Sequence, residues 1–75
     1  MKPRHDIRNT VRQHRLLRDL TQQDLAERVG VTRQTILSIE KGKYTPSVGL
    51  ALHLARALDV TVETLFQLSE GETDD

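Results

Sequence analysis

The sequence predicts an all-α fold, a compact bundle of five helices, and three observations support this prediction. The chain has only 75 residues and no cysteine, which is the length of one small domain without a disulfide framework. Its apolar residues, 36% of the total, are mostly leucine, valine, isoleucine and alanine, and aromatic residues make up 3%. Residues that begin and end helices recur at short intervals along the chain. Together these features favour short helices packed on one another.

The first predicted helix spans residues 9–18, with Asn9 as its N-terminal cap. Val11, His14 and Leu17 follow at intervals of three residues, so they are expected to share the face that packs on the core. A histidine in such an apolar series more often packs against a backbone partner than binds a metal. The three histidines share no helix spacing and have no cysteine companion, so no metal site is predicted.

Two short helices are predicted next, over residues 22–29 and 33–41. Thr21 and Thr32 stand just before them and can accept hydrogen bonds from the first backbone amides, as helix caps do. Gly30 follows the earlier helix at the position where a left-handed residue commonly ends a helix. Only a short turn therefore separates the two helices.

A fourth helix is predicted over residues 48–58, which are apolar on nearly every side of a helix. Such a pattern indicates a central helix, or one with a second buried face. Ser47 can cap this helix, and Thr45–Pro46 can serve in its place, because proline suits the first helical position. A short fifth helix is expected to begin at residues 59–61.

These elements predict one domain over residues 9–68, preceded by an N-terminal arm, 1–8, and followed by an acidic tail, 69–75. Ile7 and residues 66–68 could pair with each other as short terminal strands. No apolar run approaches the ~20 residues of a membrane span. No membrane partner is therefore expected, and the predicted location is cytoplasmic, in association with the nucleoid.

The charges of the chain are divided unevenly along its length. Eleven basic and eleven acidic residues give a net charge of zero. Residues 1–45 carry ten basic and five acidic residues, a net charge of +5, and residues 46–75 carry one basic and six acidic residues, a net charge of −5. Such asymmetry indicates a face that binds a polyanion, although charged residues also simply solvate a surface.

The segment 21–41 carries the most specific pattern of the sequence. Two helices that cross around a turn of three or four residues approach each other closely, so a small residue is needed where they meet, and Ala26 stands there. Gly30 allows the positive φ of a tight turn. Ile36 and Ile39 can press the second helix onto the first while its opposite side stays exposed. This is the pattern of a helix-turn-helix, which places its second helix in the DNA major groove.

The same residues resemble a known family, the phage-repressor-like (Xre/Cro-type) helix-turn-helix regulators. LTQQDLA at 20–26 is similar to the family's LTQxxLA opening, and VTRQTI at 31–36 with IEKG at 39–42 is similar to its recognition helix. YTPS at 44–47 and LF at 65–66 match its following loop and its end. The resemblance covers residues 9–68 and implies a lambda-repressor-like DNA-binding domain of the small, stand-alone subtype.

The resemblance implies which residues contact DNA. The exposed side of helix 33–41 supplies the candidate base contacts, and arginine and glutamine have the side-chain chemistry to read guanine and adenine. Leucine could touch a thymine methyl group. The candidate base contacts are Arg33, Gln34, Ser38 and Leu37. The candidate phosphate contacts are Gln22, Thr32, Lys41 and Lys43. The alternative interpretation of these residues is a solvated helix face.

Two further roles follow from the resemblance. Arg15 and Glu40 are similar to an internal ion pair that joins the first helix to the recognition helix, in which case neither is free to bind DNA. Members of this family of the small subtype are homodimers joined near their C-terminal ends. The predicted dimer contacts, which exceed the needs of a short fifth helix, are Val60, Leu65, Phe66 and Leu68. Phe66 could instead fill the core of the monomer.

The predicted function is a sequence-specific DNA-binding transcriptional regulator, in particular a repressor that binds a two-fold-symmetric operator as a homodimer. The expected partner is double-stranded DNA, read in the major groove by helix 33–41. An alternative is an antitoxin-type interaction module that neutralises a partner protein and binds its own promoter. An enzyme is not expected, because the sequence has no catalytic nucleophile paired with a general base and no phosphate-binding glycine loop. No cofactor and no small-molecule ligand are predicted.

Overall fold

The computed structural model describes residues 7–69 of the chain. The elements in chain order are β1 Ile7–Asn9, α1 Val11–Leu17, α2 Gln22–Val29, α3 Arg33–Glu40, α4 Val48–Leu58, α5 Val62–Leu65 and β2 Phe66–Leu68. The predicted arm and acidic tail lie largely outside the described residues. Ile7 and Arg8, which the prediction placed in the arm, belong to β1.

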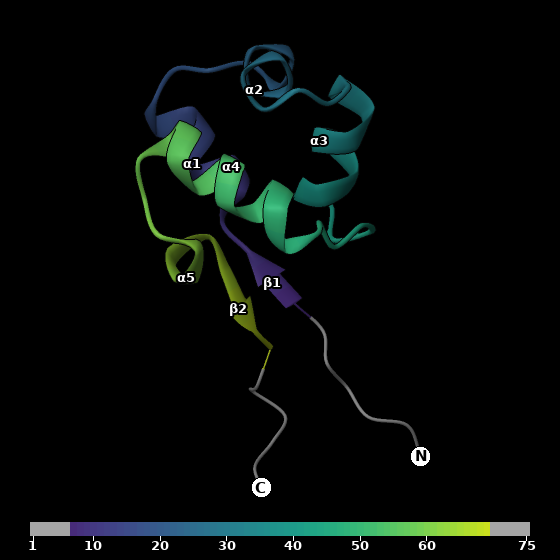
Figure 1. Ribbon diagram of the computed structural model, residues 1–75, viewed down its shortest axis with the longest axis vertical. Coiled ribbons are helices and arrows are strands. Elements are labelled where there is room, and N and C mark those ends of the chain that lie inside the picture. The colour runs from purple at the N-terminus through teal and green to yellow at the C-terminus, as the bar shows by residue number, and fades with distance from the viewer. Residues whose placement is uncertain (1–6, 70–75) are drawn as a thin grey trace, which may run out of the picture.

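The five helices surround one core, with α4 running across the middle of the molecule (Figure 1). α2 packs against both α3 and α4, and α1 contacts the same two helices. β1 and β2 form an antiparallel pair with Ile7 opposite Leu68 and Asn9 opposite Phe66. This pair lies at the end of the molecule away from α2 (Figure 1). The predicted helical bundle and its terminal strand pair are both confirmed.

The core is built from the apolar faces of all five helices. Its fully buried side chains are Val11, Leu25, Ala26, Ile36, Ile39, Leu54, Leu58 and Leu65. Ala26 and Ile36, from the two sides of the predicted turn, are both in this set, as the sequence pattern required. With Ala51 and Ala55 included, α4 supplies four buried residues, more than any other helix.

The structure corrects the predicted inner face of α1. Val11 is buried as expected, but Leu17 is 78% exposed, and the buried position one turn after Val11 belongs to Arg15. The inward residues are therefore four apart rather than three apart, which matches the helical repeat of 3.6 residues equally well. Arg15 can face the interior because its charge meets the carboxylate of Glu40 there.

The N-terminal cap of α1 also differs from the prediction. Thr10 is the residue that immediately precedes the helix, and its side chain caps no helical amide. Asn9 lies one residue earlier, in β1, yet its Oδ1 still accepts a hydrogen bond from the amide of Val11 at 3.1 Å. The hydroxyl of Thr10 instead donates to the carbonyl of Thr64 at 2.9 Å, which ties α1 to α5.

Caps at the other helices follow the sequence closely. The hydroxyls of Thr21, Thr32, Ser47 and Thr61 each accept a hydrogen bond from a backbone amide in the first turn of the next helix. Each satisfies an amide that a helix start leaves without an intrahelical partner. Ser47, rather than Thr45 with Pro46, is thus the cap of α4. These caps fix the start of α2 and α3, and so the orientation of the helix-turn-helix.

Candidate nucleic-acid interface

The turn between α2 and α3 is formed by local hydrogen bonds that the sequence specifies. Thr21 and Asp24 form a reciprocal capping box, in which each side chain accepts from the other residue's amide at 2.9 Å. Gly30 ends α2 with φ of 78°, a left-handed conformation that glycine adopts without steric cost. The amide of Val31 then donates to the carbonyl of Ala26 at 3.0 Å and closes the turn. α3 begins two residues later at a fixed angle to α2.

The hydrogen bonds of the capping box also lower the pKa of Asp24. The backbone amide of Thr21 is the largest contribution, followed by the Thr21 side chain, and Arg28 adds a smaller electrostatic one. Hydrogen bonds to a carboxylate favour its charged form. A negative charge in the first turn of a helix is also favourable, because the helix N-terminus carries a partial positive charge. The ionised carboxylate therefore stabilises the start of α2.

α3 presents its polar side to solvent. Ile36 and Ile39 anchor the helix in the core with no exposed area. The four predicted base contacts lie on the remaining surface, where Arg33 and Gln34 are exposed and Leu37 and Ser38 are half-buried. A weak hydrogen bond of 3.4 Å joins the amide of Gln34 to the hydroxyl of Ser38 one turn later. This side carries donors and acceptors suited to base edges.

A hollow of about 520 Å³ lies next to the start of α3 and brings the two helix starts together. Arg33 from α3 lines this hollow with Gln22 and Gln23 from α2. Gln23 is exposed and is paired with Glu27 at 3.0 Å, and it was missed by the sequence analysis. Its adjacency to Gln22 was the available signal, since both residues open α2. The guanidinium of Arg33 and the start of α2 thus lie beside the same hollow. Guanidinium groups and helix starts commonly contact phosphate.

The predicted phosphate contacts are placed differently from one another. Lys41 and Lys43 are exposed beyond the end of α3, where Gly42, with φ of 77°, reverses the chain. The hydroxyl of Thr32 is already used as a cap, accepting from the amide of Thr35 at 3.2 Å. The side-chain amide of Gln22 donates to Oε1 of Glu40 at 3.2 Å, and Gln22 is half-buried. Gln22 therefore belongs to a hydrogen-bond network with Glu40. Of the four residues, Lys41 and Lys43 are therefore the most accessible to a phosphate.

That network is centred on the predicted pair of Arg15 and Glu40, which are in direct contact. Nε of Arg15 donates to Oε2 of Glu40 at 2.7 Å, and Nη2 donates to Oε1 at 3.1 Å. Nη1 donates to the carbonyl of Leu20 at 2.8 Å, in the loop before α2. The two side chains are only 8% and 4% exposed, and within residues 7–69 no buried side-chain nitrogen or oxygen is left without a partner. The pair thus connects α1, the α2 start and the end of α3.

A second connection to α3 comes from β1 and could not be predicted. The side-chain amide of Asn9 donates to the carbonyl of Ile39 at 2.9 Å, across 30 residues of sequence. Its carbonyl oxygen meanwhile accepts from the amide of Val11. No sequence pattern signals such a contact, because it depends on where β1 crosses the last turn of α3. The last turn of α3 is therefore held by two contacts, one to the side chain of Glu40 and one to the carbonyl of Ile39.

The four predicted dimer contacts do not form one surface. Leu65 is fully buried in the core, so its side chain is not available to a second copy, and this part of the prediction is corrected. Val60 is half-buried and lines a cavity between α1, α2 and α4. Phe66 is half-buried and lines a separate apolar groove beside α4. Leu68 is 56% exposed in β2.

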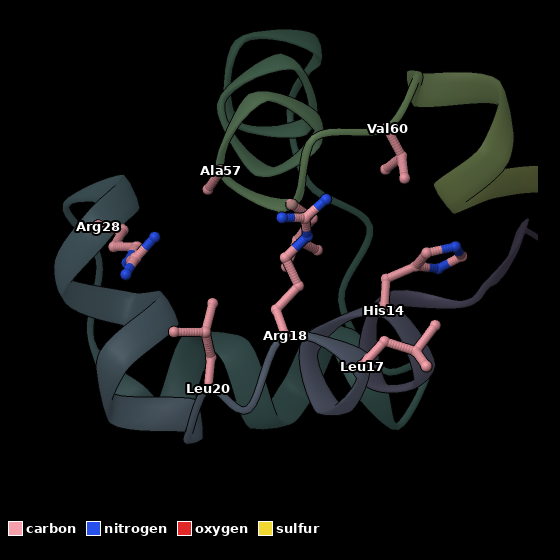
Figure 2. Close-up of a pocket in the computed structure, with 8 residues that line it drawn as sticks. His14, Leu17, Arg18, Leu20, Arg28, Ala57 and Val60 are labelled. Carbon is pink, nitrogen blue, oxygen red and sulfur yellow. The ribbon is translucent and has the colours of Figure 1, made fainter.

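The cavity that includes Val60 has a volume of about 410 Å³ and lies away from the exposed side of α3. Figure 2 shows Arg18, the residue after α1, extending toward the end of α4, with Arg28 and His14 on either side. Arg18 contacts Asp59 at 3.3 Å, an exposed pair of the kind that contributes little to stability. Basic residues in the last turns of α1 and α2 offset the partial negative charge of those helix ends.

His14 has the backbone partner that was expected for it. Its Nδ1 lies 3.0 Å from the carbonyl oxygen of Thr10, one turn earlier in α1. In the described part of the chain, no three His, Cys, Asp or Glu side chains are grouped so that they could hold a metal ion.

The geometry defines a class of protein, a DNA-binding helix-turn-helix domain. A family model described as helix-turn-helix matches residues 11–65. An uncharacterized HTH-type transcriptional regulator of Methanocaldococcus jannaschii is 46% identical over 66 residues, which are 88% of this chain and 100% of that one. The cryptic phage CTXphi transcriptional repressor RstR of Vibrio cholerae is 34% identical over 87% of this chain, and the match spans 59% of its own length.

A solved structure shows the same relationship. The restriction-modification controller protein C.AhdI of Aeromonas hydrophila superimposes with a TM-score of 0.68 and 31% identity, over 72% of this chain and 78% of that one. The chain belongs to the phage-repressor-like (Xre/Cro-type) helix-turn-helix family of transcriptional regulators. It is therefore a transcriptional regulator with a DNA-binding domain, a class of proteins that are not enzymes. None of the helices within residues 7–69 has the length and apolar character needed to cross a membrane.

Proposed function

We propose that this regulator is a repressor that binds a two-fold-symmetric operator as a homodimer, with α3 of each copy in the major groove. The observation that carries the proposal is the exposed polar side of α3, held in place by the buried side of the same helix and by the Arg15–Glu40 pair. A helix whose buried face is packed in the core and whose exposed face is polar is suited to reading base edges, because its side chains keep their register on the duplex.

Base reading is assigned to four residues along that side. Arg33 and Gln34 stand at the start of α3, both exposed, and their side chains can each form two hydrogen bonds to one base. Leu37 and Ser38 lie one turn further on and are half-buried. In this proposal they add apolar and hydroxyl contacts at neighbouring base pairs.

Binding to the DNA backbone is assigned to residues at the starts of α2 and α3 and after the end of α3. Lys41 and Lys43 follow α3, and Gln22 with Thr32 stand at the starts of α2 and α3. Their positions bracket the base-reading side, which is how backbone contacts fix the register of a protein on a duplex. The surplus of basic residues in the first part of the chain supports this arrangement.

Repression is supported by the relationship to RstR, whose name identifies it as a transcriptional repressor. The homodimer is supported by the exposed apolar residues in the C-terminal part of the domain, among them Leu68. Two copies related by a two-fold axis would place their α3 helices in major grooves about 34–36 Å apart, one helical turn of DNA.

Selection of bound duplexes from a random pool tests the proposal directly. The expected result is a short palindrome with half-site centres about one helical turn apart. A single, unrepeated site would contradict the homodimer, and an absence of any enriched sequence would contradict sequence-specific binding. A reporter gene placed behind the selected operator then tests repression, which predicts lower expression when the protein is present.

A further inference from the structure

We propose that Asn9 is a positioning residue for DNA recognition, which couples the β1–β2 strand pair to the end of the recognition helix α3. Its side-chain amide donates to the carbonyl oxygen of Ile39, in the last turn of α3, at 2.9 Å. Asn9 itself lies in β1, 30 positions earlier in the sequence. The inference rests on the operator binding proposed above and adds a residue that the sequence predicted only as a helix cap.

The orientation of the Asn9 side chain is fixed by two partners of opposite kind. Its Oδ1 accepts from the amide of Val11 at 3.1 Å, which leaves Nδ2 to donate to Ile39. An asparagine side chain carries one acceptor group and one donor group at the same distance from the backbone. An ionised aspartate has the same shape but only acceptors, and alanine has neither group. Of these three residues, only asparagine can form both contacts.

The backbone that carries Asn9 is held by the strand pair and by α5. Asn9 is opposite Phe66 in the antiparallel register of the two strands. In the next residue, the amide of Thr10 donates to the carbonyl of Leu65 and its hydroxyl donates to the carbonyl of Thr64, each at 2.9 Å. Asn9 therefore stands on backbone that is tied to the last helix and the last strand of the domain. Its side chain extends that connection to the end of α3.

The carbonyl of Ile39 lies where the chain leaves α3. The last carbonyls of a helix have no partner within the helix, so other groups must supply their hydrogen bonds. The carbonyl of Ile39 accepts from the amide of Gly42 at 2.9 Å as well as from Asn9. Lys41 and Lys43, the proposed phosphate contacts, stand on either side of Gly42 in the sequence. The Asn9 contact therefore supports the turn that carries both lysines, at the end of the base-reading helix.

This contact acts on α3 in a different way from the Arg15–Glu40 pair. The pair holds the carboxylate of Glu40, and the rotatable bonds of that side chain lie between the carboxylate and the helix. Asn9 holds the backbone of α3 directly, from a different element of the fold. Side chains that read a partner need to be held within about 0.5 Å of their productive positions. Asn9 therefore acts on DNA recognition through Ile39, by fixing the end of the helix that carries the base contacts.

The test measures how strongly the full chain prefers the selected operator to an unrelated duplex of the same length. The wild type is compared with Asn9→Asp and Asn9→Ala, which both lack the donor to Ile39, while Asn9→Asp keeps the acceptor for Val11. Affinities are expressed per folded molecule, with the folded fraction taken from circular dichroism. If Asn9→Ala does not fold, Asn9→Asp carries the test, because it keeps the cap of α1.

The ratio of operator affinity to unrelated affinity should fall by about 2- to 10-fold in both variants, the effect of one lost hydrogen bond on an equilibrium constant. The added charge of aspartate weakens binding to both duplexes, so it largely cancels in the ratio. The chemical shift of the Gly42 amide, measured without DNA, is a second readout, because this amide shares the Ile39 carbonyl with Asn9. It should move in both Asn9 variants.

Thr10→Val is the matched control, because it removes the hydroxyl that donates to Thr64 and leaves the contact between Asn9 and Ile39 in place. This variant should have a lower thermal midpoint, an unmoved Gly42 amide and the wild-type affinity ratio. If the Asn9 variants lose stability but keep the wild-type ratio, Asn9 is only structural and the inference is wrong. An equal fall of the ratio in Thr10→Val would assign the effect to lost stability and would also overturn it. A wild type that binds both duplexes equally would overturn the operator binding itself.

Discussion

Arg15 and Glu40 face each other inside the domain, with Nε of the arginine 2.7 Å from Oε2 of the glutamate. The pair links the only buried charged residue of α1 to the last residue of the recognition helix. A buried charge without hydrogen-bonding partners is strongly destabilising. Here Arg15 also donates to the carbonyl of Leu20, and Glu40 also accepts from the side chain of Gln22. The pair therefore fixes where α3 ends relative to the rest of the domain.

Replacing Glu40 by glutamine should destabilise the domain by about 3–5 kcal/mol, because it leaves the arginine charge buried without a counter-charge. The free energy of unfolding in urea measures the loss. In the double variant Arg15→Met, Glu40→Leu, both charges are removed, and this protein should be more stable than the single variant. If the single and double variants lost the same stability, the buried charge would not be the cause.

Replacing Arg33 by alanine should weaken binding to the selected operator by about 1–3 kcal/mol and relax the preference at one base pair. The reason is that a guanidinium on the exposed side of α3 can form two hydrogen bonds to guanine. Binding to operators with each base in turn at that position measures the preference. A variant that bound every operator more weakly by an equal factor would show that Arg33 contacts the backbone instead.

Replacing Lys43 by alanine should weaken binding to all duplexes alike. A lysine that contacts phosphate releases a counterion, so the slope of the logarithm of affinity against the logarithm of salt concentration should fall by about one. Lys43 is exposed after the end of α3, where such a contact is possible. Titrations of operator and unrelated DNA at several salt concentrations provide the measurement. An unchanged slope for both duplexes would remove Lys43 from the contact set.

The capping box predicts a pH dependence of stability. The pKa of Asp24 is lower in the folded chain than its ordinary value, mainly because the amide of Thr21 donates to the carboxylate. Such a group stabilises the fold above its unfolded pKa of about 3.9, and this contribution is lost as the pH falls through the lower, folded value. Asp24→Asn keeps an acceptor oxygen without the charge. The difference in free energy of unfolding between wild type and variant should be full at pH 7 and shrink below about pH 4.

A matched variant identifies the source of that dependence. Asp19 is also exposed and lies in the preceding loop, outside the capping box. Asp19→Asn should leave the acid limb of the stability curve as it is in the wild type. Equal effects of the two substitutions would indicate general charge repulsion rather than the hydrogen bonds of Asp24.

The parts of the fold that depend on neighbouring residues followed from the sequence. Thr21 and Gly30 set the ends of α2 because a hydroxyl before a helix and a left-handed glycine after it act within one turn. Ile36 and Ile39 faced the core as their spacing required. The face of α1 was misassigned because spacings of three and four residues both fit one helix. Only the contact with Glu40 selects the face that contains Arg15.

The parts of the fold that depend on packing between distant segments could not be predicted from the sequence. Leu65 was assigned to a dimer contact because an apolar residue near the end of a chain serves a core or an interface equally well, and it is buried in the monomer. The hydrogen bond from Asn9 to the carbonyl of Ile39 involves a backbone group, which leaves no trace in the residue types. The exposed face of Val48 and Leu52 could be recognised only when the opposite face of α4 was seen to fill the core.

The pairing of β1 with β2 has a consequence for the order of folding. α2 and α3 meet through neighbouring residues, whereas Ile7 and Leu68 are about 60 residues apart and must close almost the whole chain into a loop. Contacts between distant residues generally form after local ones, because the loop entropy must be overcome first. The strands should therefore be the last elements to form and the first to open. Hydrogen exchange at the amide of Thr10, bound to the carbonyl of Leu65, would then be faster than at the amide of Val31 in the central turn.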